Sequence, residues 1–418
     1  MVELRFLGSM STPGVSAKKK TVTAATMTDA VKIFARHDHR YPTGWKLRKD
    51  GPYLPVEIIF NILLYVPAKV LHEVARYVCK QWYDIVSDPD FITTHCRMSS
   101  SNSFLIQHSD QLHKASHIEP HILMGTLVLH ETPVEIPFCG AVVCCFNGLL
   151  VLLSGLRNAD EEIKYDVFYV VNPVTKVIIS LPHLTDSRHV TEVINLAVDS
   201  SGHYKVVHVS GKTAYFEQVK MRVFTIGVDK AWRFIDLRGI PAIAGERNLM
   251  LFHSFCFGGF MYWFTYYTSY DISPFGFALE VDTEIIYPLS IPKDVIKTQC
   301  PISINMGTCP GLVTEQDDIW RVWKLTDVKS SEWTELTRIN MRRVYSQINN
   351  KLGPIYFLDI RPFRLFNGHL WLRCLRGGDN YVVVHYDLTR ERFKDFRIKK
   401  LFNHALHPYA NTLVSPKN

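Results

Sequence analysis

The chain has 418 residues, of which 47% are hydrophobic and 21% are charged, and this balance is that of an ordinary globular protein. Its net charge of +7 comes mainly from the first 50 residues, which hold ten Lys or Arg and four Asp or Glu, whereas the other 368 residues hold 37 and 36. Most of the chain therefore lacks the basic excess of a nucleic-acid-binding domain, and no stretch reaches the roughly 20 apolar residues of a membrane-spanning helix.

The first 50 residues are predicted to form a disordered basic tail. The stretch from Met10 to Thr28 is rich in Ser, Thr, Ala and Lys and has little apolar periodicity, which is typical of disorder. Its run of three lysines, Lys18 to Lys20, is shorter than the basic runs that usually mark nuclear import or binding to an anionic surface. A solvated tail is the favoured interpretation.

Residues 51–95 are predicted to form a module of three short helices. Apolar residues recur at helical spacing, first from Ile58 to Val66 and then from Val70 to Val78, and Pro67 separates the two runs. A third short segment follows and is predicted to end at Asp88-Pro89. So small a unit buries little surface, so its surplus of apolar residues packs either on the rest of the chain or on a partner protein.

From residue 102 onward, the sequence predicts β-strands. Runs of β-branched and aromatic residues alternate with turns rich in Gly, Pro, Asn and Asp, as is typical of strands. Six such runs are Asp166 to Val171, Tyr204 to Val209, Met221 to Ile226, Phe277 to Val281, Ile319 to Leu325 and Tyr381 to Tyr386.

An internal repeat underlies these strands. The segments around Gly148, Gly259 and Gly368 resemble one another, and these glycines are 111 and 109 residues apart. Gly202 and Gly311 lie about halfway between them, so the repeat is about 50 residues long. That period predicts a kelch-like β-propeller of about six blades, closed by a strand near 410–414. The alternative is an irregular β-sandwich in which the spacing is coincidental.

The helical segment resembles an F-box. The residues that carry the resemblance run from Leu54-Pro55 through Pro67 and Val78-Cys79-Lys80-Gln81-Trp82 to Asp88-Pro89-Asp90-Phe91. Residues 102–416 resemble, more diffusely, the F-box-associated kelch-like domain of plant F-box proteins, for example at Phe146-Asn147-Gly148 and Asn172-Pro173. The expected fold class is therefore α+β multidomain, a three-helix F-box followed by an all-β propeller.

The resemblance implies a set of partners. An F-box binds a Skp-type adaptor, which connects it to a cullin and a RING protein in an SCF ubiquitin ligase, and the β domain captures an unknown protein substrate. The residues implied to face the adaptor are Leu54, Pro55, Ile58, Ile62, Leu63, Pro67, Leu71 and Trp82. Any of them could instead belong to the core of the module. For Ile59 and Val74, the core is the favoured position.

The sequence offers no catalytic, metal or cofactor site. Phosphate-binding glycine loops, HExxH and GxSxG are absent. His113, His117 and His121 share helical spacing, but Pro120 interrupts it, so loop histidines are favoured over a metal site. Tyr266, Tyr267 and Tyr270 are candidates for substrate binding, because exposed tyrosines often anchor partners; the alternative is that they pack between blades.

The function expected from the sequence is that of a non-catalytic adaptor. Nine scattered cysteines without CxxC spacing, and the lack of an apolar segment typical of a signal peptide, suggest the cytoplasm or the nucleus. Two alternatives remain: a scaffold that binds the adaptor without promoting ubiquitination, and a propeller enzyme with a site in its central channel.

Overall fold

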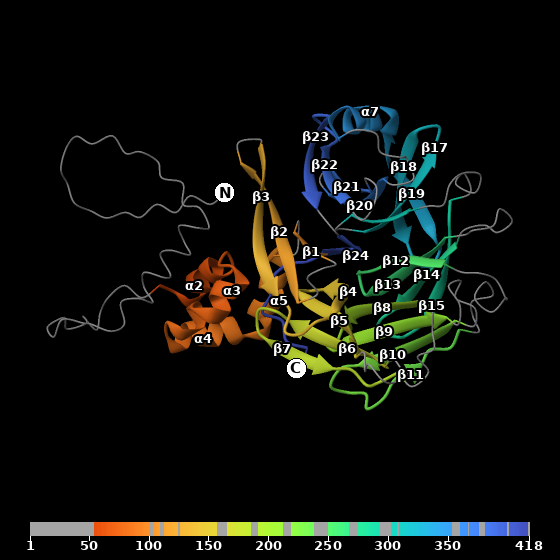
Figure 1. Cartoon of the computed structure of the whole chain (residues 1–418). Helices are drawn as coiled ribbons and strands as arrows, with labels where there is room; N and C mark the ends of the chain where they lie inside the picture. The colour runs from red at the N-terminus through yellow and green to blue at the C-terminus, as the bar shows by residue number, and fades with distance from the viewer. Residues whose placement is uncertain are drawn as a thin grey trace, which may run out of the picture. The chain divides into compact units, whose positions relative to one another are not determined.

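The structure of this protein is a computed structural model, and its residues form two compact units. The residues that it describes are 54–99, 103–108, 113–123, 126–156, 165–184, 191–211, 219–237, 250–266, 275–292, 302–306, 309–352, 360–366, 368–375, 381–398 and 401–416. The predicted tail, residues 1–50, lies outside them. Of the described helices, all but one belong to the first unit, and the described strands belong to the second (Figure 1).

Within residues 54–99, the helical unit has four α-helices rather than the three predicted. Its elements are α2 (Val56–Leu63), α3 (Ala68–Glu73), the 3-10 turn η1 (Ala75–Tyr77), α4 (Lys80–Ser87) and α5 (Pro89–Ser99). Asp88 does follow the end of α4, as predicted, but it also starts α5: its Oδ1 accepts hydrogen bonds from the backbone N–H groups of Asp90 (2.8 Å) and Phe91 (3.2 Å). Asp before Pro is a common helix start, so the predicted stop of the third helix is also the start of a further helix, α5, that was not predicted.

The second unit is a β-propeller of six four-stranded blades, which confirms the predicted fold (Figure 1). Blade 1 consists of β24 (Leu401–Pro408), β1 (Phe104–His108), β2 (Lys114–Leu123) and β3 (Thr126–Glu135). Blade 2 consists of β4 (Ala141–Phe146), β5 (Leu149–Leu156), β6 (Tyr165–Asn172) and β7 (Val177–Ser180). Blade 3 consists of β8 (Thr191–Val198), β9 (Tyr204–Gly211), β10 (Lys220–Thr225) and β11 (Arg233–Phe234).

The remaining blades continue around the ring. Blade 4 consists of β12 (Met250–Phe257), β13 (Phe260–Tyr266), β14 (Phe275–Glu280) and β15 (Ile286–Ser290). Blade 5 consists of β16 (Ile302–Asn305), β17 (Pro310–Gln316), β18 (Ile319–Asp327) and β19 (Glu332–Asn340). Blade 6 consists of β20 (Ile360–Phe366), β21 (His369–Leu375), β22 (Tyr381–Asp387) and β23 (Arg392–Ile398). Blades 5 and 6 form one sheet, because Asn305 of β16 pairs in parallel with Arg364 of β20.

Blade 1 closes the ring with strands from both ends of the unit. Strand β24 pairs antiparallel with β1, with Phe104 opposite Pro408 and Leu105 opposite His407. The closing strand therefore comes before the predicted segment at 410–414, which forms no strand. Its residues are nevertheless partly or fully buried, and the Val414 carbonyl accepts a hydrogen bond from Asn172 Nδ2 at 2.7 Å.

The predicted repeat glycines mark the first turn of successive blades. Gly148, with φ of 77°, lies between β4 and β5, and Gly202, Gly259 and Gly368 hold the same left-handed backbone between the corresponding strands. Such hairpin turns favour glycine because it has no Cβ. Gly311 differs: it lies in β17, where an added Cβ would come within 2.6 Å of Met306 Cε.

The structure also explains why the strongest similarity recurs every second blade. Inner strands β4, β12 and β20 each carry an irregularity typical of a β-bulge before the repeated Phe-x-Gly turn. Blades 3 and 5 share a different feature. In each, a tryptophan donates a hydrogen bond to the preceding blade. Trp232 Nε1 donates to the Pro182 carbonyl, next to the outer strand of blade 2, at 2.7 Å. Trp333 Nε1 donates to the Ser290 carbonyl, in the outer strand of blade 4, also at 2.7 Å.

We expect Trp333→Phe to lower the free energy of unfolding by about 1 kcal/mol, because it removes this bond between neighbouring blades and keeps most of the ring. Urea unfolding of the full chain measures the change. The control is Leu336→Ala on the same strand, 53% exposed, which should stay within about 0.5 kcal/mol of wild type. A Trp333→Phe protein as stable as wild type would show that the bond contributes nothing.

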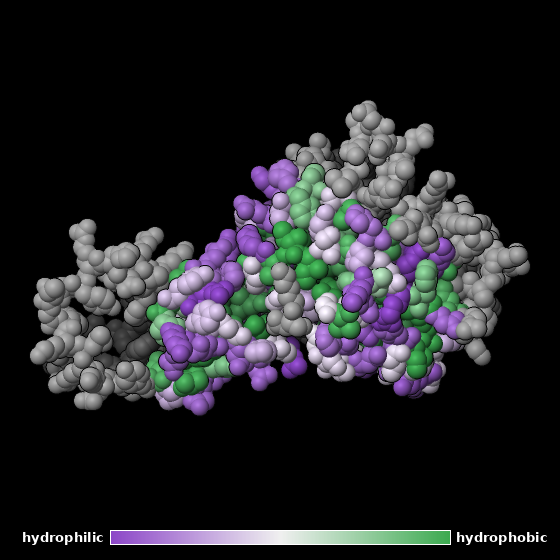
Figure 2. All heavy atoms as spheres, turned by 90° about the horizontal axis from the view of Figure 1, so that it is seen from below, coloured by the Kyte–Doolittle hydropathy of each residue, from purple (hydrophilic) through white to green (hydrophobic). Residues whose placement is uncertain are grey.

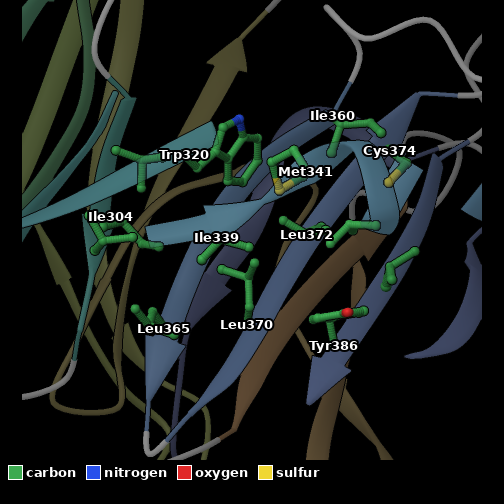
Figure 3. Packing of buried hydrophobic residues seen from close by; sticks show 14 of the residues in the cluster. Ile304, Trp320, Ile339, Met341, Ile360, Leu365, Leu370, Leu372, Cys374 and Tyr386 are labelled. Atoms are coloured by element: carbon green, nitrogen blue, oxygen red, sulfur yellow. The ribbon is translucent and has the colours of Figure 1, made fainter. Parts of the chain in front are cut away.

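Helix α7 (Met341–Leu352) extends the core between blades 5 and 6. Its residues Met341, Val344 and Ile348 are buried, and they join a cluster with side chains from both blades. In Figure 3, Met341 lies between Trp320 of blade 5 and Cys374 of blade 6. The helix therefore bridges two neighbouring blades through apolar packing rather than lying free on the surface.

Candidate functional site

The helical unit has a small core of its own. Leu63, Leu71 and Phe91 are fully buried, and the Phe60 ring meets the Phe91 ring edge-on at 5.1 Å. His95 is also buried, and its Nε2 lies 2.9 Å from the Val66 carbonyl oxygen. Burial lowers the pKa of His95, so the ring is neutral at physiological pH and packs as part of this core.

The structure divides the eight residues that the F-box resemblance assigned to a partner. Leu54 is 55% exposed, Ile58 is 45% exposed, and Pro55 and Pro67 are exposed as well. Ile62 and Trp82 are partly exposed. Leu63 and Leu71 have no exposed surface and can only be core residues, so a direct partner contact from these two side chains does not fit the structure.

Helical periodicity explains this division. Ile58 and Ile62 are four residues apart in α2 and share one face, while Ile59 and Leu63 share the neighbouring face that packs inward. Both faces are apolar, so the sequence alone does not tell which one is buried. Ile59 is 7% exposed, in agreement with the predicted core position, whereas Val74 remains partly exposed.

The helical unit exposes more large apolar side chains than its size would suggest. Among the described residues, fourteen large apolar side chains are exposed, and eight of them lie between residues 54 and 98. These eight are Leu54, Val56, Ile58, Tyr65, Tyr77, Val78, Tyr83 and Met98. Viewed from below, the helical unit at the left of Figure 2 shows green, hydrophobic residues at its surface. A surface of this kind typically binds another protein.

One part of this surface was missed by sequence reasoning. Tyr77 is 71% exposed and Tyr83 is 44% exposed, and the Arg76 guanidinium lies 5.4 Å and 5.2 Å from their ring centroids. Exposed aromatic residues beside arginine are frequent anchors of protein interfaces. Because Tyr77 is the last residue of η1 and Tyr83 lies in the separate helix α4, no single helical repeat brings the two together, and the pattern was not visible in the sequence.

The tyrosines proposed for substrate binding fall largely outside the described residues. Tyr267 and Tyr270 are not among them, and of Tyr266 only the backbone position at the end of β13 is described. The described part of the same aromatic run is core: Tyr262 is 2% exposed and Trp263 is fully buried, with its ring stacked on Phe277 at 5.1 Å.

Among the described carboxylates of the propeller, Glu315 has the most strongly shifted pKa. Burial raises its pKa to about 7, although Trp320 Nε1 donates a hydrogen bond to its Oε2 at 3.0 Å. Such a pKa suits acid–base catalysis, but it arises equally at structural positions. Among the described residues, no three His, Cys, Asp or Glu side chains come together as metal ligands would. His117, once a weak metal candidate, lies in β2 with its ring edge-on to Tyr409 at 5.0 Å.

We expect Glu315→Gln to stabilise the propeller at pH 8 and to change little at pH 4.5. The pKa of Glu315 rises from 4.5 to about 7 on folding, so the unfolded state ionises first and stability is lost as the pH climbs between these values. At about 1.4 kcal/mol per pKa unit, reduced because the group is partly exposed, the gain at pH 8 should be about 1–2 kcal/mol. Urea unfolding at both pH values measures it, and an equal effect at both would contradict the assigned pKa.

No helix in the described ranges combines the length and the apolar character needed to cross a membrane.

The chain matches two protein-family models. The model described as "F-box associated beta propeller domain" matches residues 99–416, and the model described as "F-box-like" matches residues 52–98. The first of these covers most of the chain.

Several relatives from Arabidopsis thaliana are similar to this chain. F-box protein At5g49610 is 23% identical over 312 residues, which cover 70% of this chain and 81% of the relative. F-box protein At1g47810 is 24% identical over 339 residues, covering 69% and 88%. With a third relative, 26% identical over 234 residues, the match covers 54% of this chain and only 57% of the relative.

Among solved structures, prolyl oligopeptidase B from Galerina marginata is similar over 79% of this chain and 44% of its own, with 12% identity and a TM-score of 0.36. A likeness this distant says nothing about activity.

Proposed function

This chain belongs to the F-box proteins that carry an F-box associated β-propeller domain, and we propose that it is the substrate-recognition subunit of an SCF-type ubiquitin ligase. The helical unit binds a Skp-type adaptor, which connects it to a cullin and a RING protein. The propeller captures a target protein in the cytoplasm or the nucleus. The chain itself catalyses nothing: it acts by holding the target near the ubiquitin-charged enzyme, which raises the effective concentration of the reacting groups.

One observation carries the proposal: the crowding of exposed apolar side chains on the helical unit. Eight large apolar side chains are exposed among residues 54–98, although the core of the helical unit is already filled by Leu63, Leu71 and Phe91. Leaving this surface in water is unfavourable, by roughly 25 cal/mol for each Å² that a partner could cover. Leu54 and Ile58, at the start of the unit, are the proposed centre of the contact.

The experiment is reconstitution of the complex from purified proteins. The full chain is mixed with a recombinant Skp-type adaptor and separated by size-exclusion chromatography, and then the adaptor is supplied together with the cullin and the RING protein. We expect the chain to elute with the adaptor alone and with the larger assembly. If a chain whose circular dichroism shows both helix and strand elutes alone in both runs, the proposal is wrong.

Binding of the adaptor without ubiquitin transfer is a separate outcome. A chain that joins the adaptor but not the cullin and RING assembly would be a scaffold rather than a ligase subunit. That result would keep the role of the helical surface and overturn the ligase assignment.

A further inference from the structure

The interface between blades 3 and 4 holds two buried N–H donors for which the described residues offer no acceptor. Asn195, in the inner strand β8 of blade 3, is 2% exposed, and its Nδ2 has no hydrogen-bond partner. Trp263, in β13 of blade 4, is fully buried, and its Nε1 has none either. A buried donor without an acceptor is unfavourable, so each of these groups calls for a physical explanation.

Asn195 faces blade 4. Side chains alternate along a strand, and Val193 and Ala197, two residues away on either side, pack in one cluster with Met261 of blade 4. A direct contact agrees with this direction, because Ser254 Oγ, in β12 of blade 4, donates a hydrogen bond to Asn195 Oδ1 at 2.7 Å. This bond engages the oxygen of the amide and directs Nδ2 to the other side.

Trp263 faces the same interface at the same level of the blade. Its ring belongs to the cluster that blades 3 and 4 share, so it points toward blade 3. The register of β12 and β13 places the bulge between Phe252 and Phe255 opposite Trp263, and that bulge contains Ser254. Strand β8 lies against both β12 and β13. Ser254 therefore connects the two donors, because it bonds to Asn195 and is a cross-strand neighbour of Trp263.

The protein around these donors has little to offer them. The indole of Trp263 is stacked on the Phe277 ring, with centroids 5.1 Å apart and planes 18° from parallel, which fixes its orientation. The shared cluster is otherwise apolar, and none of its described residues carries a charge. Cys256 borders the cluster, but its thiol already donates to the Leu196 carbonyl at 3.1 Å.

These surroundings define the chemistry of the missing acceptor. It has to be small, because the interior of a protein is close-packed. It has to be neutral, because an ion brought into uncharged, apolar surroundings loses its hydration without compensation. A water molecule meets both conditions: it can accept one hydrogen bond from each N–H and donate one to Ser254 Oγ, whose own hydrogen is used by Asn195.

We propose that one buried water molecule binds between blades 3 and 4, where it accepts from Asn195 Nδ2 and Trp263 Nε1 and donates to Ser254 Oγ. It links the inner strands of the two blades close to the axis of the ring. Trp232 and Trp333 donate directly to a carbonyl of the neighbouring blade, whereas Trp263 makes the corresponding link through water. This site does not depend on the proposed function.

The test is water-edited NMR on the full chain, with its eight tryptophans labelled with ¹⁵N and the Trp263 signal assigned from Trp263→Phe. We expect a cross-peak between the Trp263 indole proton and water, with the sign typical of a bound water. The matched control is Trp320, which is 1% exposed and donates to Glu315 Oε2 at 3.0 Å. It should give no such peak at pH 8, where Glu315 is mostly ionised. Absence of the peak at Trp263 would overturn the proposal.

A second measurement decides by the direction of a stability change. Trp263 is replaced by β-(3-benzothienyl)alanine, which keeps the shape of the ring and has sulfur in place of the N–H group. We expect the urea midpoint of unfolding to fall by roughly 0.2–0.4 M, because a hydrogen bond is lost. The same replacement at Trp320, which loses its bond to Glu315, should also lower the midpoint. An unchanged or higher midpoint at Trp263 would show that its N–H has no acceptor to lose.

A crystal structure with bromide in the mother liquor separates water from two rivals. We expect an oxygen-sized peak without anomalous signal within hydrogen-bond distance of both nitrogens. An anomalous peak there would identify a halide and overturn the proposal. So would an amide of Asn195 in the reverse orientation, with Oδ1 accepting directly from Trp263 Nε1. No adaptor is present in these experiments, so their outcome and that of adaptor binding are independent.

Discussion

Replacing both Leu54 and Ile58 with Asp should weaken binding of the Skp-type adaptor at least 100-fold while both units stay folded. The two side chains are 55% and 45% exposed, so the carboxylates would lie in water in the free protein. In the proposed complex they would be buried against apolar surface, where an unpaired charge is strongly unfavourable. Central interface residues typically account for losses of this size. Titration calorimetry with the purified adaptor measures the loss.

Two comparisons separate a surface effect from a folding effect. Leu336→Asp places a charge at a propeller position that is 53% exposed, and it should leave adaptor affinity unchanged. Leu63→Ala, in the core of the helical unit, should instead destabilise that unit by about 2–5 kcal/mol. If the Leu54→Asp/Ile58→Asp protein binds the adaptor within twofold of wild type, the adaptor does not use this face.

Ending the chain at residue 400 should prevent the propeller from forming a stable ring. The truncation removes β24, the innermost strand of blade 1, and leaves one edge of β1 unpaired, although β1 keeps its pairing with β2. It also removes the buried side chains of Tyr409 and Val414 and the carbonyl that binds Asn172. Their burial alone contributes several kcal/mol, which is a large share of a domain's net stability. We expect loss of the near-ultraviolet circular dichroism signal and aggregation through the exposed strand edge.

The matched control removes the same number of residues, 18, from the other end of the chain. That protein should keep its circular dichroism spectrum and its cooperative unfolding. A synthetic peptide of residues 401–418 added to the truncated chain should restore part of the signal. A truncated chain that unfolds cooperatively, with the stability of wild type, would show that β24 does not close the ring.

The repeat made the propeller predictable from sequence because its signals are local. Turn glycines such as Gly148 and Gly368 recur with the blades, and each required only its neighbours in sequence to be recognised. All six predicted strand runs fall within or next to β6, β9, β10, β14, β18 and β22. The closing strand was misplaced because Ala410 to Val414 is as apolar as a strand, and only the pairing of β24 with β1 tells the two segments apart.

Other features depended on contacts that no local pattern contains. Leu63 and Ile62 are adjacent and both apolar, and packing against Phe91 and its neighbours decides which of them is buried. Helix α7 has a helical pattern in its sequence, since Met341, Val344 and Ile348 follow helical spacing. The pattern was not recognised because the sequence on either side of it predicts strands.

The measurement that addresses the proposed role most directly compares proteins bound in plant cells by the full chain and by its Leu54→Asp/Ile58→Asp variant, with the proteasome inhibited. Bound proteins and the ubiquitin attached to them are quantified by mass spectrometry. We expect the same proteins on the propeller in both cases, with ubiquitin conjugates on them enriched at least fivefold by the intact chain. Equal ubiquitination of the bound proteins in both samples would contradict a role that links target capture to the ligase.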